Sequence, residues 1–421
     1  MKRLVTPLQT FFHYGIAALL VGMPFHALVV TVSGNFLGNR AIWQSWKEVL
    51  IVLLTSAALW LFWQNKKRNF SLHAANIAAL LVIVLGVAIT LFARVDVVQA
   101  LFGYKVVLLP IVLYLIVQLA DARLSEEHLL KLVLWPSYIV ATLAILQEFF
   151  IPLSWWSALG YNDSTIRPLQ LVDPAVKSIR AFASLGGPNQ LGAYLIFPTI
   201  LSLVYALRSR KWQYGVGALV LLAGLITSFS RSAWIGLIVA LFAAIFIFGN
   251  KLVRLITVTS VAIGIGLLFS VAQTLPTRLS NTQAQYFLLH GRYNDAREIE
   301  GSDYGRIQAL NKAVDSIKDH PWGNGLGTAG PASFVSSQPV ITENWYLQIV
   351  IEIGLIGLVL FAVFFLDNLI TLVRSQSFMA KALAASLCGL LITNMFLHAW
   401  ADSTLGIIIF LMMGMLRSKK A

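Results

Sequence analysis

Residues 77–93 of the chain read IAALLVIVLGVAITLFA, an apolar run without a single charged side chain. A hydrocarbon core of roughly 30 Å needs about 20 apolar residues in a helix, because every backbone group in lipid must find its partner inside the segment. The run does not alternate between apolar and polar residues, as a strand of a membrane barrel would. It therefore predicts a membrane-spanning helix.

The rest of the chain has the same character. Of its 421 residues 58% are hydrophobic and only 12% are charged, and the mean hydropathy is +0.77, which excludes an ordinary soluble domain. We expect an all-α, polytopic fold with residues 1–421 forming one membrane domain. The sequence predicts about twelve transmembrane helices, near 12–32, 49–64, 72–92, 104–120, 130–150, 190–207, 213–229, 232–249, 255–273, 345–366, 380–397 and 402–416.

The basic residues between these spans fix an orientation. With the amino terminus inside, every short basic cluster falls on one side, as the positive-inside rule requires. The clusters are Lys66 to Arg68, Arg123 with Lys131, Arg208 with Arg210 and Lys211, Lys251 with Arg254, Arg374 with Lys381, and Arg417 with Lys419 and Lys420. We expect a multi-pass protein of the cytoplasmic (inner) membrane with both termini cytoplasmic. The net charge of +13 then belongs to these loops, and no nucleic-acid partner is expected.

Two segments on the opposite side are too long for simple turns, namely 151–189 and 274–343. The second is a large periplasmic or extracellular loop between the ninth and tenth spans. Within it, Ile307, Leu310, Val314 and Ile317 recur at helical spacing, and Pro321 follows. We expect an amphipathic helix near 306–318 that begins at Arg306 and packs its apolar stripe on the bundle or the membrane surface.

Arg231 is the most informative residue of the chain. It lies in the sequence Ser228 to Trp234, SFSRSAW, between two spans joined with almost no loop. A cation at this boundary is costly unless it meets an anion or water. The alternative is an arginine that anchors a helix end at the interface, which is common on the positive inner side. Because Arg231 is expected on the outer side, we favour a functional role.

Three further cations are expected on the same side. Arg180 ends the first long outer segment, Lys105 opens the fourth span, and Arg306 starts the amphipathic helix. Together with Arg231 they would form a basic cluster suited to a phosphate or pyrophosphate. Taken singly, Lys105 is equally well explained as a snorkelling end residue, and Arg180 as a solvated loop charge.

Glu343 is the candidate proton acceptor. It precedes Asn344 at the start of the tenth span, which carries a second acid at Glu352. Desolvation raises the pKa of a carboxylate at such a boundary and neighbouring arginines lower it, which is the setting of a general base. The competing interpretation is a helix amino-terminal acid that interacts favourably with the helix dipole.

Two other patterns are weaker indications of function. Gly325 to Gly330 reads GLGTAG and matches the dinucleotide fingerprint, but no strand precedes it, so a tight glycine turn is expected. His398 and Asp402 have a spacing that would suit a metal pair on a continuous helix, but a polar pair closing a turn is the better interpretation. We expect no metal and no cofactor.

The order of these motifs resembles the O-antigen ligase and O-antigen polymerase superfamily. The resemblance covers residues 180–358 and rests on SRSAW, on PWGNGLG within the large loop, and on ENWYLQIVIEIGLIGL from Glu343. It implies a GT-C-type membrane glycosyltransferase that takes a glycan from an undecaprenyl-pyrophosphate carrier on the outer face. The acceptor would be a glycan, a lipid or a protein, and membrane lipid would surround the enzyme.

By matching positions, Arg231 and Arg306 would bind the pyrophosphate, with Arg180 and Lys105 as additions. Ligases of this superfamily typically carry His-Asn where this chain has Glu343-Asn344, so the sequence does not separate a ligase from a polymerase. Glutamate can still accept a proton from an acceptor hydroxyl.

Two other function classes remain open. A transporter or flippase of lipid-linked glycans could use the same cations, although related halves with broken helices are not evident in the sequence. A scaffolding membrane protein would leave the arginines unexplained.

Overall fold

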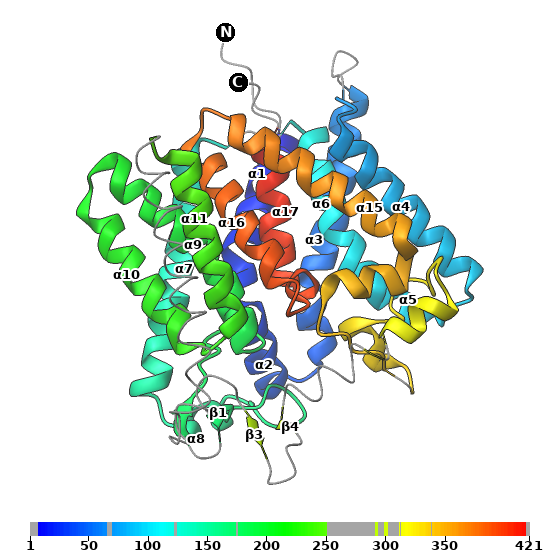
Figure 1. Cartoon of the computed structure of the whole chain (residues 1–421). Coiled ribbons are helices and arrows are strands. Elements are labelled where there is room, and N and C mark those ends of the chain that lie inside the picture. Colours follow the sequence, from blue (N-terminus) through cyan, green and yellow to red (C-terminus); the bar gives the residue numbers. More distant parts are fainter. Residues whose placement is uncertain are drawn as a thin grey trace, which may run out of the picture.

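The protein is a bundle of helices with two short β-hairpins at one end (Figure 1). The computed structural model describes residues 7–64, 70–121, 124–173, 176–250, 291–293, 299–301, 311, 313–337 and 339–417. The first part of the chain forms α1 (Pro7–Gly22), η1 (Met23–Phe25), α2 (His26–Phe36), α3 (Arg40–Gln64), α4 (Ala74–Phe92), α5 (Val97–Gly103), η2 (Tyr104–Leu108), α6 (Leu109–Leu119), α7 (Glu126–Phe149) and α8 (Leu153–Ala158). The remainder forms β1 (Leu171–Asp173), β2 (Val176–Ile179), α9 (Pro188–Ser209), α10 (Trp212–Thr227), α11 (Arg231–Phe248), β3 (Gly291–Tyr293), β4 (Ile299–Gly301), η4 (Gly330–Val335), α15 (Trp345–Arg374), α16 (Phe378–Thr393), η5 (Ala399–Ala401) and α17 (Ser403–Arg417).

The all-α, polytopic prediction is confirmed. Eight helical segments of the described chain are long and apolar enough to cross a membrane, and they coincide with eight of the predicted spans. Three shorter apolar helices, α10, α16 and α17, coincide with three more. The predicted span at 255–273 lies outside the described residues, so the count of twelve stays a prediction.

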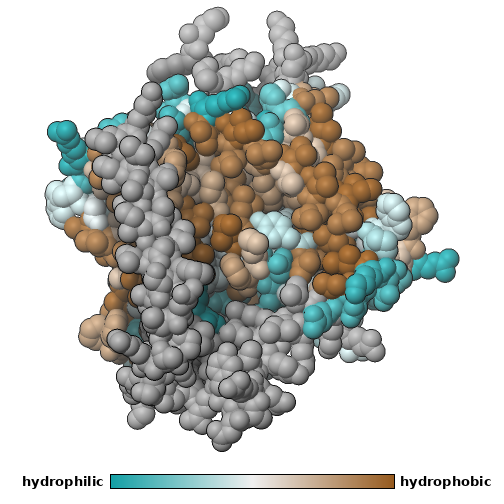
Figure 2. Space-filling view, viewed as in Figure 1, coloured by the Kyte–Doolittle hydropathy of each residue, from teal (hydrophilic) through white to brown (hydrophobic). Residues whose placement is uncertain are grey.

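The surface fits a lipid environment. Among the residues that Figure 2 colours, apolar ones fill the middle of the face, and hydrophilic ones gather at its top and at its lower right. Large apolar side chains are exposed on many helices, among them Trp63 on α3, Phe92 on α4 and Leu207 on α9. Contiguous apolar surface of this extent is unstable in water and normal against lipid.

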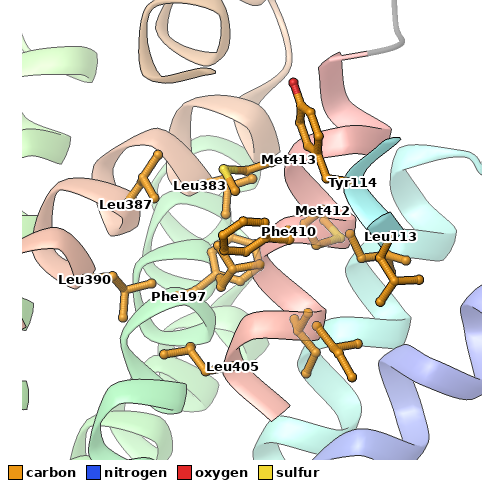
Figure 3. Close-up of a cluster of buried hydrophobic side chains, with 14 of the residues drawn as sticks. Leu113, Tyr114, Phe197, Leu383, Leu387, Leu390, Leu405, Phe410, Met412 and Met413 are labelled. Carbon is orange, nitrogen blue, oxygen red and sulfur yellow. The ribbon is translucent and has the colours of Figure 1, made fainter. Parts of the chain in front are cut away.

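The core is centred on α17. Every residue of this helix from Thr404 to Leu416 is buried, although it contains only 15 residues. In Figure 3 its Phe410, Met412 and Met413 lie among side chains from α6, α9 and α16. Neighbouring helices therefore surround α17. The turn η5, which directly precedes α17 in the chain, is placed inside the bundle as well, with Ala399 and Trp400 buried.

Close helix packing depends on small residues. A Cβ atom on Gly236 of α11 would collide with Thr393 Oγ1 of α16, and one on Gly389 of α16 would collide with the carbonyl oxygen of Gly236. Glycine at both positions therefore lets the two backbones approach, as is typical of membrane bundles where lipid supplies no hydrophobic drive for association.

Several elements differ from the predicted ones. The first span is interrupted at Met23–Phe25, and the fourth segment begins at Val97, so Lys105 lies in its third turn and not at its end. The first long outer segment contains α8 and the hairpin β1–β2, which the sequence did not predict. Residues 313–319 are helical, and Ile317 packs near Ile351 of α15. Because 302–310 lies outside the described residues, the amphipathic helix near 306–318 stays a prediction.

Candidate active site

A cavity of about 420 Å³ lies beside η5, and we call it the η5 cavity. It receives residues from the start of α9, from η4, from the segment before α15 and from the connection between α16 and α17. Its lining comprises Asn189, Gln190, Ala193, Pro331, Phe334, Ile341, Glu343, Leu397, His398, Ala399, Ala401, Asp402, Ser403 and Leu405. Four segments that are far apart in the sequence thus meet around a single space.

Glu343 lines this cavity from a strained turn. Its φ of +47° is in the left-handed region that residues other than glycine rarely adopt. The following residue, Asn344, caps α15, since its Oδ1 accepts hydrogen bonds from the backbone N–H groups of Tyr346 and Leu347 at 2.9 and 3.2 Å. The carboxylate is therefore presented by a turn that the helix cap holds in place.

Thr342 ties that turn to η5. Its hydroxyl donates to the backbone oxygen of Asn344 at 2.8 Å and lies 2.7 Å from His398 Nε2. A hydroxyl carries only one proton, so His398 Nε2 is the donor in the second contact. Burial lowers the pKa of His398 to about 4, and the imidazole is neutral at pH 7.

Asp402 is a second carboxyl on the same wall. Its Oδ1 accepts a hydrogen bond of 3.0 Å from the backbone N–H of Leu405, in the first turn of α17. Burial raises the pKa of Asp402, and this is opposed by that backbone donor and by the charge of Lys47. The sequence favoured a polar pair closing a turn for His398 and Asp402. The chain between them is the 3₁₀ turn η5 and not a continuous helix.

Arg180 is linked to the cavity wall. Its Nη2 donates to Asn189 Oδ1 at 2.8 Å, and its Nε donates to the backbone oxygen of Ser228 at 3.3 Å. Asn189 lines the cavity, while Ser228 lies three residues before Arg231 at the junction of α10 and α11. The structure thus brings Arg180 between the cavity and the Arg231 junction.

The segment after Arg180 is anchored on both sides. Gln147 Oε1 accepts hydrogen bonds from the backbone N–H groups of Phe182 and Ala183 at 3.0 and 2.7 Å. The Phe182 ring packs edge-on to Trp156 and stacks with Tyr161, with ring centroids 4.9 and 5.4 Å apart. This small aromatic cluster, built from the first long outer segment, fixes the backbone next to Arg180.

Lys105 belongs to a separate ionic group. Its Nζ lies 2.6 Å from Glu48 Oε1, and Lys47 Nζ lies 3.3 Å from the same oxygen. Lys47 is fully buried and contacts His26 Nε2 at 2.7 Å. Two lysines share one carboxylate, and Lys105, on the π-helical turn η2 that packs against η5, keeps about a third of its side chain exposed.

The predicted site residues lie in different places. Glu343 lines the cavity, Arg180 is bound to its wall, and Arg231 starts α11. Lys105 on η2 is paired with Glu48, and Arg306 lies outside the described residues. Sequence reasoning missed Asn189 and gave His398 and Asp402 a minor role. Asn189, His398 and Asp402 come together because α9 contacts η5, and this contact joins parts of the chain that are distant in the sequence.

The glycine motif and Glu352 have a structural role. Gly325, Gly327 and Gly330 all have positive φ, and Glu352 Oε1 accepts a hydrogen bond of 3.0 Å from the backbone N–H of Gly327. Glu352 is fully buried, and α15 is interrupted at Gly354, where φ is +75°. The predicted tight glycine turn is present, and it packs on the break in α15. Among the described residues no group of three or more His, Cys, Asp or Glu side chains is arranged for a metal ion.

Comparisons with known proteins agree with the sequence motifs. The O-antigen ligase family model matches residues 216–362 of the chain. An O-antigen polymerase of Salmonella muenchen is 24% identical over 324 residues, which cover 75% of this chain and 78% of that protein. Both findings confirm the resemblance to the O-antigen ligase and O-antigen polymerase superfamily.

Proposed function

We propose, from this confirmed resemblance and from the geometry of the η5 cavity, that the protein is a membrane glycosyltransferase of the O-antigen ligase or polymerase type. The donor in this proposal is a glycan linked to undecaprenyl pyrophosphate, and the acceptor is a hydroxyl group of a glycan, lipid or protein. The reaction takes place on the outer face of the cytoplasmic membrane. The positive-inside pattern of the loops supports that orientation.

The observation that carries the proposal is the hydrogen bond between Arg180 and Asn189. Asn189 and Glu343 line the same cavity, so a cation is bound at the wall of a space that also contains a carboxylate. A transferase with a pyrophosphate leaving group needs a proton acceptor and a cation on opposite sides of one sugar carbon. The η5 cavity supplies the carboxylate of Glu343. Arg180 and Arg231, which we call the arginine rim, supply the cations.

In the proposed reaction the acceptor oxygen attacks the anomeric carbon of the donor sugar. A new C–O bond forms, and the bond from that carbon to the pyrophosphate oxygen breaks. Glu343 accepts the proton of the acceptor hydroxyl, and the electron pair leaves with undecaprenyl pyrophosphate. Arg231 and Arg180, with Arg306 and Lys105 as further candidates, stabilise the charge that develops on the leaving phosphate.

The left-handed turn at Glu343 fits this role. A carboxylate that must meet a substrate is best held by a backbone that cannot relax, and the Asn344 cap and the Thr342 hydrogen bond restrict this one. His398 remains neutral near pH 7, so it does not neutralise Glu343 by charge.

The test uses the purified protein in lipid nanodiscs with undecaprenyl-pyrophosphate-linked glycan and candidate acceptors. Loss of the donor is followed by mass spectrometry for the wild type, Arg231→Ala and Glu343→Gln. Both variants should lose about 100-fold or more in turnover, the range measured for removing one charge-stabilising donor or a general base. Arg167→Ala is the matched control, because Arg167 is an exposed arginine in the segment before Arg180 that pairs with Asp163.

Two results would contradict the proposal. Donor consumption that Arg231→Ala and Glu343→Gln leave intact would remove the assigned roles. No consumption with any acceptor, together with carrier movement across sealed vesicles, would favour the transporter. The mass of the product separates ligation from polymerisation.

A further inference from the structure

We propose that the η5 cavity is the binding site for the acceptor sugar, and that Phe334, Gln190 and Asp402 determine which sugar it accepts. This inference rests on the proposed function and assigns the acceptor side of that reaction. It separates the site into a cavity for a neutral, hydroxyl-rich ring and an arginine rim for the diphosphate.

The charges of the lining point to a neutral ligand. Among the described residues around the cavity, the ionisable side chains are Glu343, Asp402 and His398, and none is lysine or arginine. A diphosphate placed in this space would lie against two carboxyl groups, which repel it. Arg180 is not part of this lining, but its Nη2 donates a hydrogen bond to Asn189, which is.

The polar groups of the lining suit hydroxyl groups. Carboxylate oxygens accept hydrogen bonds from hydroxyls, and the amides of Asn189 and Gln190 can both donate and accept. Both amides lie in the first turn of α9, whereas Glu343 and Asp402 come from the segments before α15 and α17. A ring that carries several hydroxyl groups can therefore be bound on more than one edge.

Phe334 supplies the apolar face that a sugar ring also needs. It lies in η4, lines the cavity, and is 68% exposed, which is unusual for a residue next to a polar space. A flat aromatic ring offers a large contact area at low conformational cost, and the C–H groups of a sugar can pack on its negatively polarised face. Phe334 is thus a cavity-lining aromatic residue with much of its surface uncovered.

The size of the cavity fits a short segment of glycan. Small-molecule sites usually occupy roughly 300–1,000 Å³, and a volume of about 420 Å³ is near the lower limit. It has room for about two sugar rings on that scale, while the rest of an acceptor would extend away from the protein.

The first measurement is direct binding, because it does not depend on turnover. The probe is the repeat-unit oligosaccharide released by mild acid from the native lipid-linked donor, observed by saturation-transfer NMR with the protein in nanodiscs. We expect saturation transfer from the wild type, a reduction of about tenfold in affinity for Phe334→Ala and Asp402→Asn, and no displacement by inorganic pyrophosphate. Tenfold corresponds to one good aromatic or charge-assisted contact, about 1.4 kcal/mol.

The second measurement is kinetic. With both substrates varied, Phe334→Ala and Gln190→Ala should raise the KM for the acceptor about tenfold and leave the KM for the lipid-linked donor unchanged. Trp322→Ala is the matched control, since Trp322 is a similarly exposed aromatic residue, at 74%, that does not line the η5 cavity. Val335→Ala serves as a second control from the same turn η4.

The outcomes separate this inference from the proposed function. Displacement of the oligosaccharide by pyrophosphate, a raised donor KM, no binding by the wild type, or unchanged binding in Phe334→Ala and Asp402→Asn would each overturn the acceptor site. Binding that depends on Phe334 in a protein that consumes no donor would uphold the sugar site and reject the transferase.

Discussion

Arg180 Nη2 donates a hydrogen bond of 2.8 Å to Asn189 Oδ1, and Asn189 is at once the partner of the cation and part of the η5 cavity. The amide is neutral, so it orients the guanidinium without cancelling its charge. The hydrogen bond thereby holds the Arg180 guanidinium at the rim of the cavity.

This relationship predicts effects of different size for two substitutions of Asn189. Asn189→Ala removes the hydrogen bond, and the KM for the lipid-linked donor should rise a few-fold. Asn189→Asp keeps an acceptor in place but adds a charge that pairs with Arg180 and competes with the pyrophosphate. The donor KM should therefore rise more in Asn189→Asp than in Asn189→Ala, and most at low ionic strength.

If Arg180 serves only to hold the loop, the order is reversed, because an ion pair would hold it better than an amide does. Steady-state kinetics at 20 mM and 300 mM salt distinguish the two, with the unfolding temperature as a check on the loop itself.

The junction that carries Arg231 predicts a sensitivity to volume. A Cβ atom on Gly192 of α9 would lie 2.7 Å from Ala233 Cβ and 2.9 Å from Ser228 Oγ, which is closer than real Cβ contacts. Gly192→Ala should push the segment from Ser228 to Ala233 away from α9 and lower turnover at least tenfold, since a shift near 1 Å at a reacting centre costs about 100-fold.

Gly215→Ala is the matched control for that substitution. Gly215 also lies inside a helix, α10, but nothing approaches its Cβ position within 4 Å. Alanine should leave turnover unchanged there and raise stability slightly, because glycine costs about 1 kcal/mol in a helix interior. Equal turnover in the two variants would show that the junction tolerates displacement.

The spans were predictable because their physical cause is local. A run such as 77–93 can satisfy its backbone in lipid only as a helix, whatever its neighbours are, and α4 forms there. The break at Gly354 was not predictable in the same way. It exists because the backbone of Trp322 and Pro321 lies against that residue, a contact from a segment 32 and 33 residues earlier in the chain.

The residues of the candidate site also fall into two groups, those that a local pattern predicts and those that only distant contacts reveal. Arg231 and Glu343 could be selected because a charge at a span boundary is costly wherever it lies. His398 and Asn189 look ordinary in the sequence, and their importance follows from the contacts His398–Thr342 and Asn189–Arg180. Such pairings depend on how α9, α15 and η5 meet, which no local pattern encodes.

His398 predicts how stability depends on pH. Burial lowers its pKa to about 4 in the folded protein, while an unfolded chain takes up the proton near the ordinary value of 6.5. Between these values the unfolded state binds more protons, so stability is complete above about pH 6.5 and falls as the pH drops toward 4. The raised pKa of Asp402 acts in the opposite sense, because the folded state then holds its proton to higher pH.

His398→Gln isolates the first effect, since glutamine can still donate to Thr342 but does not titrate. Its unfolding temperature should fall less than that of the wild type between pH 7 and pH 5. Identical losses in the two proteins would mean that His398 is protonated without cost in the folded state.

Thr342→Val, which removes the partner hydroxyl, should lower turnover by loosening the Glu343 turn, and Thr342→Ser should restore it.

The opposite end of α17 predicts an asymmetric stability effect. Arg417 Nη2 lies 2.6 Å from Asp367 Oδ2, and Nη1 donates to Asn368 Oδ1 at 3.1 Å, with the arginine side chain only 4% exposed and the aspartate 28% exposed. Asp367→Asn leaves a buried cation without its counter-charge and should cost about 3 kcal/mol of unfolding free energy. Arg417→Met leaves only a carboxylate that water can reach, so its cost should be smaller. The double variant should resemble Arg417→Met, because no buried cation remains.

Thermal unfolding in one detergent measures all three variants. Fourteen residues of helix, about 20 Å, separate Arg417 from the η5 end, so the KM values of the folded variants should not change. An Arg417→Met variant less stable than Asp367→Asn would show instead that the arginine acts mainly through its packing and its hydrogen bond to Asn368.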